Sequence, residues 1–173
     1  MRSTVIVTGG AGYIGRNVVA QLARRFTVIS IDKEEPKSLP PGAEFIHADL
    51  TSDASVTEAF RGISDKFGNR LASCVHLAAY YDFSGEPSPL YRQLTVDGTR
   101  RMLQALQDFS VEQFVFSSTL LVMKPADDEA ETITESSPVD PAWDYPRSKV
   151  QAEEVIREAR GAIPAVILRI AGV

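Results

Sequence analysis

The chain has 173 residues, an apolar fraction of 44% and a formal net charge of −5. This length suffices for one domain with a sizeable hydrophobic core, so we expect a single domain over residues 1–173. The acidic balance and the lack of a basic stripe in the sequence argue against a nucleic-acid partner. The chain has a single cysteine, Cys74, which lies in an apolar run. Because one cysteine cannot form a disulfide within the chain, the sequence has no disulfide framework and fits a reducing compartment.

Neither end of the sequence predicts a targeting or membrane segment. The first apolar run begins within a few residues of the N-terminus, which does not fit a signal peptide. Residues 163–173 form the most apolar tail, but Arg169 interrupts them and the stretch is too short to span a bilayer. We therefore expect a cytoplasmic protein without a membrane partner.

A β-branched run at residues 5–8 leads into a cluster of glycines, and residues 16–23 follow with helical apolar spacing. The glycines fit two spacings at once, Gly10-x-Gly12-x-x-Gly15 and Gly9-x-x-Gly12-x-x-Gly15. A strand, a tight turn and a helix N-terminus form a phosphate site, because free N–H groups and the positive end of the helix dipole face the anion. Glycine suits the turn, since a Cβ would hold the phosphate away from the backbone. The pattern predicts the phosphate-binding half of a dinucleotide site.

The next apolar run, residues 26–31, ends on Asp32. An acidic residue at the tip of the second strand, roughly 20 residues after the glycine turn, suits a contact with both hydroxyls of a ribose. The alternative is a glycine-rich turn with an unrelated surface acid.

Strands and helices continue to alternate along the rest of the chain. Apolar runs predict strands at residues 44–48, 71–78, 111–117 and 165–170, and helical patterns occupy residues 53–60, 90–109 and 145–160. Near-continuous apolar strands separated by helices indicate an α/β fold in which a doubly wound parallel sheet has helices on both faces. We expect the strand order 3-2-1-4-5-6, with the ligand at the carboxyl ends of the strands where the order reverses.

A second candidate site begins at Tyr145. Tyr145 and Lys149 are one helical turn apart, so they share a face of the predicted helix. A tyrosine is a poor base at neutral pH because its ordinary pKa is about 10. A nearby ammonium favours the phenolate and makes the tyrosine a useful general acid or base. The alternative is an ordinary amphipathic helix whose tyrosine packs and whose lysine is solvated.

The ends of two predicted strands support the first interpretation. Hydroxyls at residues 117–119 end the fifth strand, and small residues at 78–79 end the fourth, where a nucleotide needs room. His76 and His47 also lie near strand ends, and we assign both a structural or supporting role rather than catalysis.

These motifs occur in the order seen in extended short-chain dehydrogenase/reductases, in the NAD-dependent epimerase/dehydratase branch. The motifs are residues 8–15, Asp32, Asp49-Leu50, residues 76–79, residues 116–119 and Tyr145-x-x-x-Lys149. The sequence resembles that family along its whole length. The resemblance implies a Rossmann-type fold, NAD as cofactor and no metal site.

The resemblance also implies roles for individual residues. Gly9, Gly12 and Gly15 would carry the pyrophosphate loop, Asp32 would contact the adenosine ribose, Asp49 and Leu50 would flank the adenine, and Ala78 and Ala79 would line the path toward the nicotinamide. The other residues that would contact the cofactor are Tyr13, Ile14, Leu77, Tyr145 and Lys149. Tyr145 resembles the family's acid/base residue and Lys149 its partner on the nicotinamide ribose. Thr119 falls where the family has a substrate-orienting serine and keeps the hydroxyl.

Three further positions bear on the resemblance. Thr95 stands where the family usually has asparagine, and a hydroxyl lacks the amide's paired donor and acceptor. Gly98 lies inside a predicted helix, where glycine costs about 1 kcal/mol relative to alanine, so we expect a close packing contact there. Arg169 resembles the family's arginine after the last core strand.

Family members usually continue into a smaller domain that shapes the substrate pocket, and we expect that domain to be largely missing from this fragment. The resemblance implies an oxidoreductase, epimerase or dehydratase in which Tyr145 relays a proton while hydride moves to or from the nicotinamide. Its partner would be a small-molecule substrate, and a nucleotide sugar is the family's commonest one. The alternative is a non-catalytic NAD-binding sensor or scaffold, and the retained Tyr145, Lys149 and Thr119 favour the enzyme.

The resemblance further implies a homodimer. Family members commonly dimerise through the helices that correspond here to residues 90–109 and 145–160. The first of these carries more apolar residues than one sheet-facing stripe needs. They are Leu94, Met102, Leu103, Ala105, Leu106 and Phe109. We expect some of them to face a two-fold partner.

Overall fold

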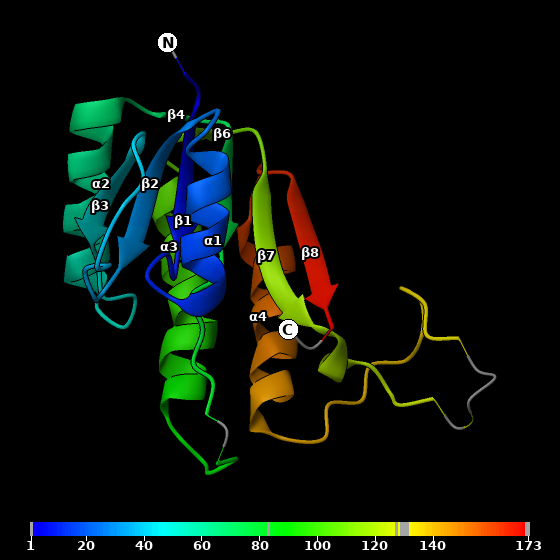
Figure 1. Ribbon diagram of the computed structural model, residues 1–173. Coiled ribbons are helices and arrows are strands. Elements are labelled where there is room, and N and C mark those ends of the chain that lie inside the picture. The colour runs from blue at the N-terminus through cyan, green and yellow to red at the C-terminus, as the bar shows by residue number, and fades with distance from the viewer. Residues whose placement is uncertain (1, 83, 127, 129–131, 172–173) are drawn as a thin grey trace.

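The computed structural model describes residues 2–82, 84–126, 128 and 132–171. Its six-stranded sheet consists of β1 (Thr4–Thr8), β2 (Thr27–Asp32), β3 (Ala43–His47), β5 (Ser73–His76), β7 (Phe114–Thr119) and β8 (Ala165–Ile170). All neighbouring strands are parallel, in the order β3-β2-β1-β5-β7-β8 (Figure 1). Numbered among these six strands alone, this is the predicted order 3-2-1-4-5-6, which is confirmed.

Two of the predicted strands are each divided in two. Residues 70–71 form the short strand β4 (Arg70–Leu71), which pairs with β6 (Ser110–Val111) in a separate two-stranded sheet. The chain then changes neighbours, because Leu71 is in register with Val111 whereas Ser73 is in register with Val5 of β1. The sequence pattern does not reveal this change, because β4 and β5 both contain buried residues and together read as one apolar run.

The helices lie on both sides of the sheet. They are α1 (Tyr13–Leu22), α2 (Asp53–Phe67), α3 (Asp97–Leu106) and α4 (Asp144–Ala159). Figure 1 shows α1 in front of β1, with α3 and α4 behind the sheet. Two apolar clusters correspond to the two sides: a smaller one between α1 and the sheet, which includes Val7 and Val19, and a larger one on the face covered by α2, α3 and α4.

The predicted helix 90–109 is not a uniform α-helix. It begins as a π-helix, η1 (Tyr91–Val96), in which the N–H of Asp97 donates to the carbonyl of Arg92, five residues earlier. The α-helical part, α3, ends at Leu106. Tyr91, Thr95 and Val96 are all buried, so the π-turn directs two consecutive side chains inward together with the tyrosine.

Gly98 makes the close contact that its position in a helix predicts. A Cβ added there would lie 3.3 Å from both the Cβ and the carbonyl oxygen of Leu50. The helix therefore approaches the segment between β3 and α2 more closely than an alanine would allow comfortably.

The apolar residues expected at a dimer interface are used by the chain itself. Met102, Leu103 and Leu106 are fully buried, and Leu94, Ala105 and Phe109 pack against the same core cluster. The surplus of apolar residues on this helix therefore does not point to a partner, because the chain's own core accommodates all six. A homodimer stays a prediction.

Two features are absent from the described part of the chain. It contains no helix long and apolar enough to cross a membrane. The described residues also include no group of three or more His, Cys, Asp or Glu side chains arranged to hold a metal ion.

Candidate functional site

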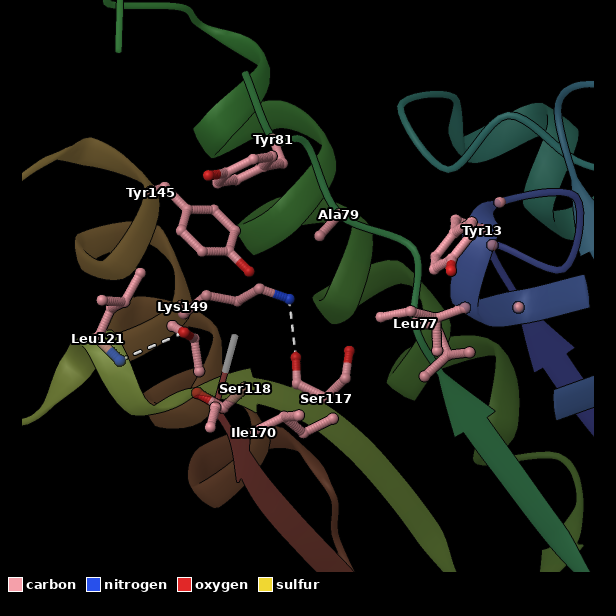
Figure 2. Close-up of a pocket in the computed structure, with 16 residues that line it drawn as sticks. Tyr13, Leu77, Ala79, Tyr81, Ser117, Ser118, Leu121, Tyr145, Lys149 and Ile170 are labelled. Atoms are coloured by element: carbon pink, nitrogen blue, oxygen red, sulfur yellow. Dashed lines mark hydrogen bonds between the residues drawn. The ribbon is translucent and has the colours of Figure 1, made fainter. Parts of the chain in front are cut away.

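A cavity of about 420 Å³ lies at the carboxyl ends of the central strands, beside the reversal of strand order between β1 and β5 (Figure 2). Ligands of doubly wound sheets bind at such a reversal. The predicted site residues that line the cavity are Gly9, Gly12, Tyr13, Ile14, Gly15, Leu77, Ala79, Thr119, Tyr145 and Lys149. The other lining residues are Tyr81, Ser117, Ser118, Leu121, Ile170 and Ala171. Asp32, Asp49, Leu50 and Ala78 are outside this lining.

The glycine turn forms one end of the cavity. Gly9 has a φ of +69°, and a Cβ there would lie 2.9 Å from the amide nitrogen of Ala78. A Cβ on Gly15 would lie 2.8 Å from the Cα of Gly10 and closer still to the carbonyl of Gly9. The turn is thus packed against backbone on both sides, which only glycine allows.

The glycine turn leads into the N-terminus of α1. Gly12 is the N-cap residue of α1 and contributes no side-chain cap. The first N–H groups of a helix have no partner within the helix, and the positive end of the helix dipole lies at the same place. The arrangement fits a phosphate group.

Gly10 has a different role from its neighbours. Its N–H donates to the carbonyl of Ile31 at 3.3 Å, and a Cβ there would collide with the hydroxyl of Ser30. Gly10 therefore lets the turn pack against β2. Of the two overlapping glycine spacings, the one through Gly9, Gly12 and Gly15 lines the cavity.

Asp32 ends β2 beside the glycine turn. Its Oδ2 accepts a hydrogen bond of 3.0 Å from the N–H of Ala11, and its Oδ1 accepts one of 3.3 Å from the N–H of Glu34. The carboxylate is therefore held at the edge of the turn, although it does not line the cavity. Its contact with a ribose stays a prediction.

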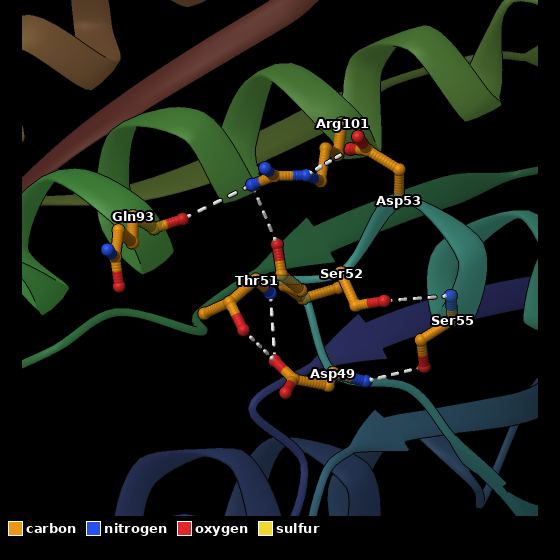
Figure 3. A network of polar contacts seen from close by, with 8 residues as sticks. Asp49, Thr51, Ser52, Asp53, Ser55, Gln93 and Arg101 are labelled. Atoms are coloured by element: carbon orange, nitrogen blue, oxygen red, sulfur yellow. Dashed lines mark hydrogen bonds and ion pairs between the residues drawn. The ribbon is translucent and has the colours of Figure 1, made fainter.

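Asp49 and Leu50 both make hydrogen bonds within the chain, and Figure 3 shows those of Asp49. The Oδ1 of Asp49 accepts hydrogen bonds from the N–H and the hydroxyl of Thr51, at 2.8 and 2.7 Å. These bonds lower the pKa of Asp49. The side chain of Leu50 is buried, and its carbonyl accepts a hydrogen bond of 3.2 Å from Arg101. Neither side chain reaches the cavity, so a role beside an adenine stays a prediction.

His76 is fully buried between two threonines and has a structural role in this arrangement. Thr99 donates its hydroxyl proton to the carbonyl of Thr95 at 2.6 Å, so it accepts from the Nε2–H of His76 at 3.0 Å. The Nδ1 of His76 is then the acceptor for the hydroxyl of Thr8 at 2.6 Å. Burial, with a contribution from the charge of Lys149, lowers the pKa of His76 to about 3 and keeps the ring neutral.

Thr8 and Thr95, at the two ends of this series of hydrogen bonds, also bind the backbone of the segment after β5, which forms a wall of the cavity. The hydroxyl oxygen of Thr8 accepts hydrogen bonds from the N–H groups of Leu77 and Ala78, both at 3.2 Å. The hydroxyl oxygen of Thr95 accepts one from the N–H of Tyr80 at 3.0 Å. Thr95, where an asparagine is usual in the family that the sequence resembles, thus still anchors the segment after β5 by its hydroxyl.

Tyr145 and Lys149 face the cavity from the first turns of α4. Figure 2 shows the Tyr145 hydroxyl and the Lys149 amine directed into the same space. The Nζ of Lys149 donates to the carbonyl of Ser117 at 2.8 Å and lies 5.8 Å from the centre of the Tyr145 ring. Thr119 lines the same cavity from the end of β7, and its hydroxyl oxygen accepts a hydrogen bond of 3.3 Å from the N–H of Leu121. The structure therefore brings the three predicted catalytic side chains to one cavity.

The electrostatics of this pair differ from the expectation drawn from the sequence. Burial raises the pKa of Tyr145, and the neighbouring Tyr81 and Tyr91 raise it further. Burial lowers the pKa of Lys149 to about 7, against the opposing effect of Glu153. The lysine ammonium is directed to a carbonyl of β7, so a lowered tyrosine pKa is not what this arrangement produces.

A buried carboxylate that the sequence motifs did not single out lies one turn beyond Lys149. The side chain of Glu153 is only 1% exposed. It accepts two hydrogen bonds from Arg169 of β8, at 3.1 and 2.8 Å, one from Ser118 of β7 at 2.6 Å and one from Arg157 at 2.9 Å. Burial alone would raise the pKa of Glu153, but the bonds from Arg169 and Ser118 outweigh it and lower the pKa.

This ion pair fixes the helix that carries Tyr145 to the sheet. Because Glu153 follows Lys149 by one turn, it continues the buried face of α4, and Arg169 interrupts an otherwise apolar strand. Those two signals in the sequence indicate that each side chain lies on a buried face, but the pairing of the two depends on how α4 packs against β8.

Comparison with known proteins finds relatives that are named as enzymes. Residues 5–173 match the model of the NAD dependent epimerase/dehydratase family. The N-acetyl-alpha-D-glucosaminyl-diphospho-ditrans,octacis-undecaprenol 4-epimerase of Escherichia coli O157:H7 is 27% identical over 158 residues, which cover 91% of this chain and 44% of that protein. The sterol-4-alpha-carboxylate 3-dehydrogenase of Candida albicans is 25% identical, with 98% of this chain and 50% of that protein covered.

A solved structure agrees with the sequence matches. The UDP-glucose 4-epimerase of Thermus thermophilus, crystallised as a complex with NAD, superposes with a TM-score of 0.79 at 30% identity over 96% of this chain and 54% of that chain. The present chain spans about half the length of the curated relatives it matches. The family match contains both the glycine turn and the helix of Tyr145 and Lys149, and it leaves out only the first four residues. We conclude that this chain belongs to the NAD-dependent epimerase/dehydratase family.

Proposed function

We propose that the protein binds NAD in this cavity and uses it to oxidise and reduce a hydroxyl-bearing carbon of a sugar. The observation that carries the proposal is the placement of Tyr145, Lys149 and Thr119 in the same cavity as the glycine turn. A phosphate cradle and a set of proton-transferring groups at the two ends of one cavity suit a dinucleotide whose reactive ring is remote from its phosphates.

The residues present fit NAD. The backbone of residues 9–15 would receive the pyrophosphate at the N-terminus of α1, because Gly12 caps that helix without a side chain and leaves its first N–H groups facing the cavity. Asp32 would accept hydrogen bonds from the adenosine ribose, and Lys149 would bind the ribose next to the nicotinamide. When bound, NAD supplies the acceptor and donor of hydride.

The side chains at the other end of the cavity would handle the proton. Tyr145 would take the proton of the substrate hydroxyl as hydride leaves the same carbon, and would return it when the carbonyl is reduced. The hydroxyl of Thr119 accepts a bond from Leu121, and its own proton is available to donate to the substrate oxygen.

Two relatives support the substrate class. The Escherichia coli and Thermus proteins are both named 4-epimerases, one of a sugar carried on a polyprenyl diphosphate and the other of a sugar carried on UDP. A hexose joined to a diphosphate is the chemistry that these two names share. We therefore propose a glycosyl diphosphate as the substrate of the protein that carries this chain.

The decisive experiment removes the hydroxyl of Tyr145 and leaves the packing of its ring unchanged. Tyr145→Phe keeps the ring and its packing, so NAD affinity measured by calorimetry should stay within about twofold. Turnover of UDP-glucose by the whole protein should fall by about 10²–10⁴-fold, since a general acid/base contributes that much. Unchanged turnover would refute the role of Tyr145. NAD binding without turnover of any glycosyl diphosphate by the native protein would favour the non-catalytic sensor or scaffold.

A further inference from the structure

We propose that Tyr81, packed against Trp143, forms a subsite that stacks against the C–H face of the substrate's pyranose ring. This inference deepens the proposed function and rests on it for the direction in which the substrate lies. Tyr81 and Tyr145 line the cavity, and the ring of Trp143 packs against both of them.

Three aromatic rings from two distant segments meet at this place. Tyr81 follows β5, whereas Trp143 and Tyr145 lie at the beginning of α4. The ring centres of Tyr81 and Tyr145 are 4.6 Å apart with the rings nearly perpendicular, and those of Trp143 and Tyr145 are 5.6 Å apart. Tyr81 and Trp143 are separated by 6.2 Å. Such contacts hold the rings in a fixed arrangement.

The subsite is at the substrate end of the cavity. Figure 2 shows Tyr81 over Tyr145, on the far side of Tyr145 from Ser117, while Tyr13 of the glycine turn lies at the opposite end. If the phosphates of the dinucleotide lie at the glycine turn, the space beside Tyr145 is left for the substrate, whose hydroxyl exchanges a proton with Tyr145. Tyr81 lines the cavity and remains 44% exposed, so its ring surface is accessible to a ligand.

The chemistry of this end favours a sugar over an apolar ring. Polar groups lie beside the aromatic rings here, because Thr119 and Tyr145, which both carry hydroxyls, line the same cavity. A pyranose has a C–H face that packs on aromatic rings and a rim of hydroxyls that needs hydrogen-bond partners. A steroid nucleus would leave the polar groups unpaired, which is unfavourable in a desolvated site.

The chain itself contains a reporter for this subsite. Trp143 is its only tryptophan, so the tryptophan emission of the chain arises beside Tyr81 and Tyr145. We would titrate the chain, with and without saturating NAD, using UDP-glucose, UDP and a 3β-hydroxysteroid. UDP is the matched ligand that lacks the sugar. We expect a saturable change in emission with UDP-glucose and no comparable change with UDP or the steroid. An equal response to UDP and UDP-glucose, or a response to the steroid alone, would overturn the subsite.

Two variants separate the ring of Tyr81 from its hydroxyl. Tyr81→Ala should weaken UDP-glucose binding about tenfold, the value expected for loss of one aromatic contact, and should leave UDP and NAD binding unchanged. Tyr81→Phe keeps the ring and should restore the sugar affinity. Unchanged NAD affinity also shows that the variants fold. Sugar affinity unaltered by Tyr81→Ala would refute the inference.

The outcomes distinguish this inference from the proposed function. If the whole protein turns over UDP-glucose and Tyr81→Ala does not raise KM, the subsite is wrong and the proposed function stands. If UDP-glucose binds through Tyr81 but no hydride is transferred to bound NAD, the subsite stands and the proposed chemistry is wrong.

Discussion

At the scale of single residues, the glycine turn shows how one residue type serves three different contacts. Gly9 needs a positive φ, Gly10 needs room for Ser30, and Gly15 faces the backbone of the turn itself. The sequence predicts such a turn from its spacing and the strand and helix around it. It does not show which glycine meets which neighbour, because those contacts depend on how the turn folds onto β2 and the segment after β5.

Gly15→Ala should damage both stability and cofactor binding. Its Cβ would meet backbone atoms of Gly9 and Gly10, which no side-chain rotation can relieve. We expect the free energy of unfolding to fall by about 1–3 kcal/mol, as in other overpacked sites, and NAD affinity to fall with it. Urea unfolding and calorimetry measure the two effects.

The chain offers a matched control for that substitution. Gly62 lies within α2 with nothing within 4 Å of an added Cβ. Gly62→Ala should therefore be neutral or stabilising by up to about 1 kcal/mol. An equal loss of stability in both variants would show that the packing of the turn is not the cause.

Asp32 should determine the choice between the two nicotinamide cofactors. Its carboxylate is held beside the glycine turn by Ala11 and would repel the 2′-phosphate of NADP. We expect NAD to bind at least about tenfold more tightly than NADP, a difference of about 1.4 kcal/mol. Calorimetry with both cofactors tests this, and Asp32→Asn should reduce the preference. Equal or tighter binding of NADP to the native chain would contradict it.

At the scale of elements, His76 joins β1, β5 and α3 by hydrogen bonds made in its neutral form. Because its pKa of about 3 in the folded chain is below the unfolded value of about 6.5, the unfolded chain binds more protons between these pH values. Stability from this group is complete above about pH 6.5 and is lost as the pH falls toward 3. The slope is at most about 1.4 kcal/mol per pH unit.

A variant isolates that contribution. His76→Gln keeps one donor and one acceptor but cannot titrate, so the difference in unfolding free energy from the native chain should shrink as the pH falls. Urea unfolding at a series of pH values measures it, and the carboxylates common to both proteins cancel. A difference that is constant with pH would contradict the buried neutral histidine.

The sequence predicted the helices and strands better than the contacts between them. The strand order follows from the alternation of strands and helices in a doubly wound fold, and the shared face of Tyr145 and Lys149 follows from helical periodicity. The division of residues 71–78 into two strands, the raised pKa of Tyr145 and the ion pair of Glu153 with Arg169 do not. Each depends on which side chains of distant segments surround the group, and that information is absent from a local pattern.

At the scale of the whole molecule, the chain leaves the question of a homodimer to experiment. The apolar side chains of α3 are used within the core, so an interface would have to use the polar outer surfaces of α3 and α4. Arg100 of α3 and Glu158 of α4 lie on those surfaces and approach each other to 3.7 Å with both side chains largely exposed.

We expect a two-fold dimer through α3 and α4. Light scattering should then give about twice the chain mass of 18.9 kDa at high protein concentration. Arg100→Glu should shift the equilibrium toward the monomer, because it places like charges at the expected interface, and Arg61→Glu on the exposed side of α2 is the matched control. A mass of one chain at every concentration would exclude the dimer.

The π-helix η1 constrains the number of residues in this segment as well as their type. A π-turn contains one residue more than an α-turn, so the direction of Tyr91 relative to Thr95 depends on the number of residues between Tyr91 and Val96. Thr95 anchors Tyr80, whose ring packs against Tyr91 with centres 4.8 Å apart. Loss of a single exposed residue such as Gln93 would convert the segment to an α-helix and rotate its first turn away from that anchor. We therefore expect this wall of the cavity to tolerate substitution at exposed positions of η1 but not insertion or deletion.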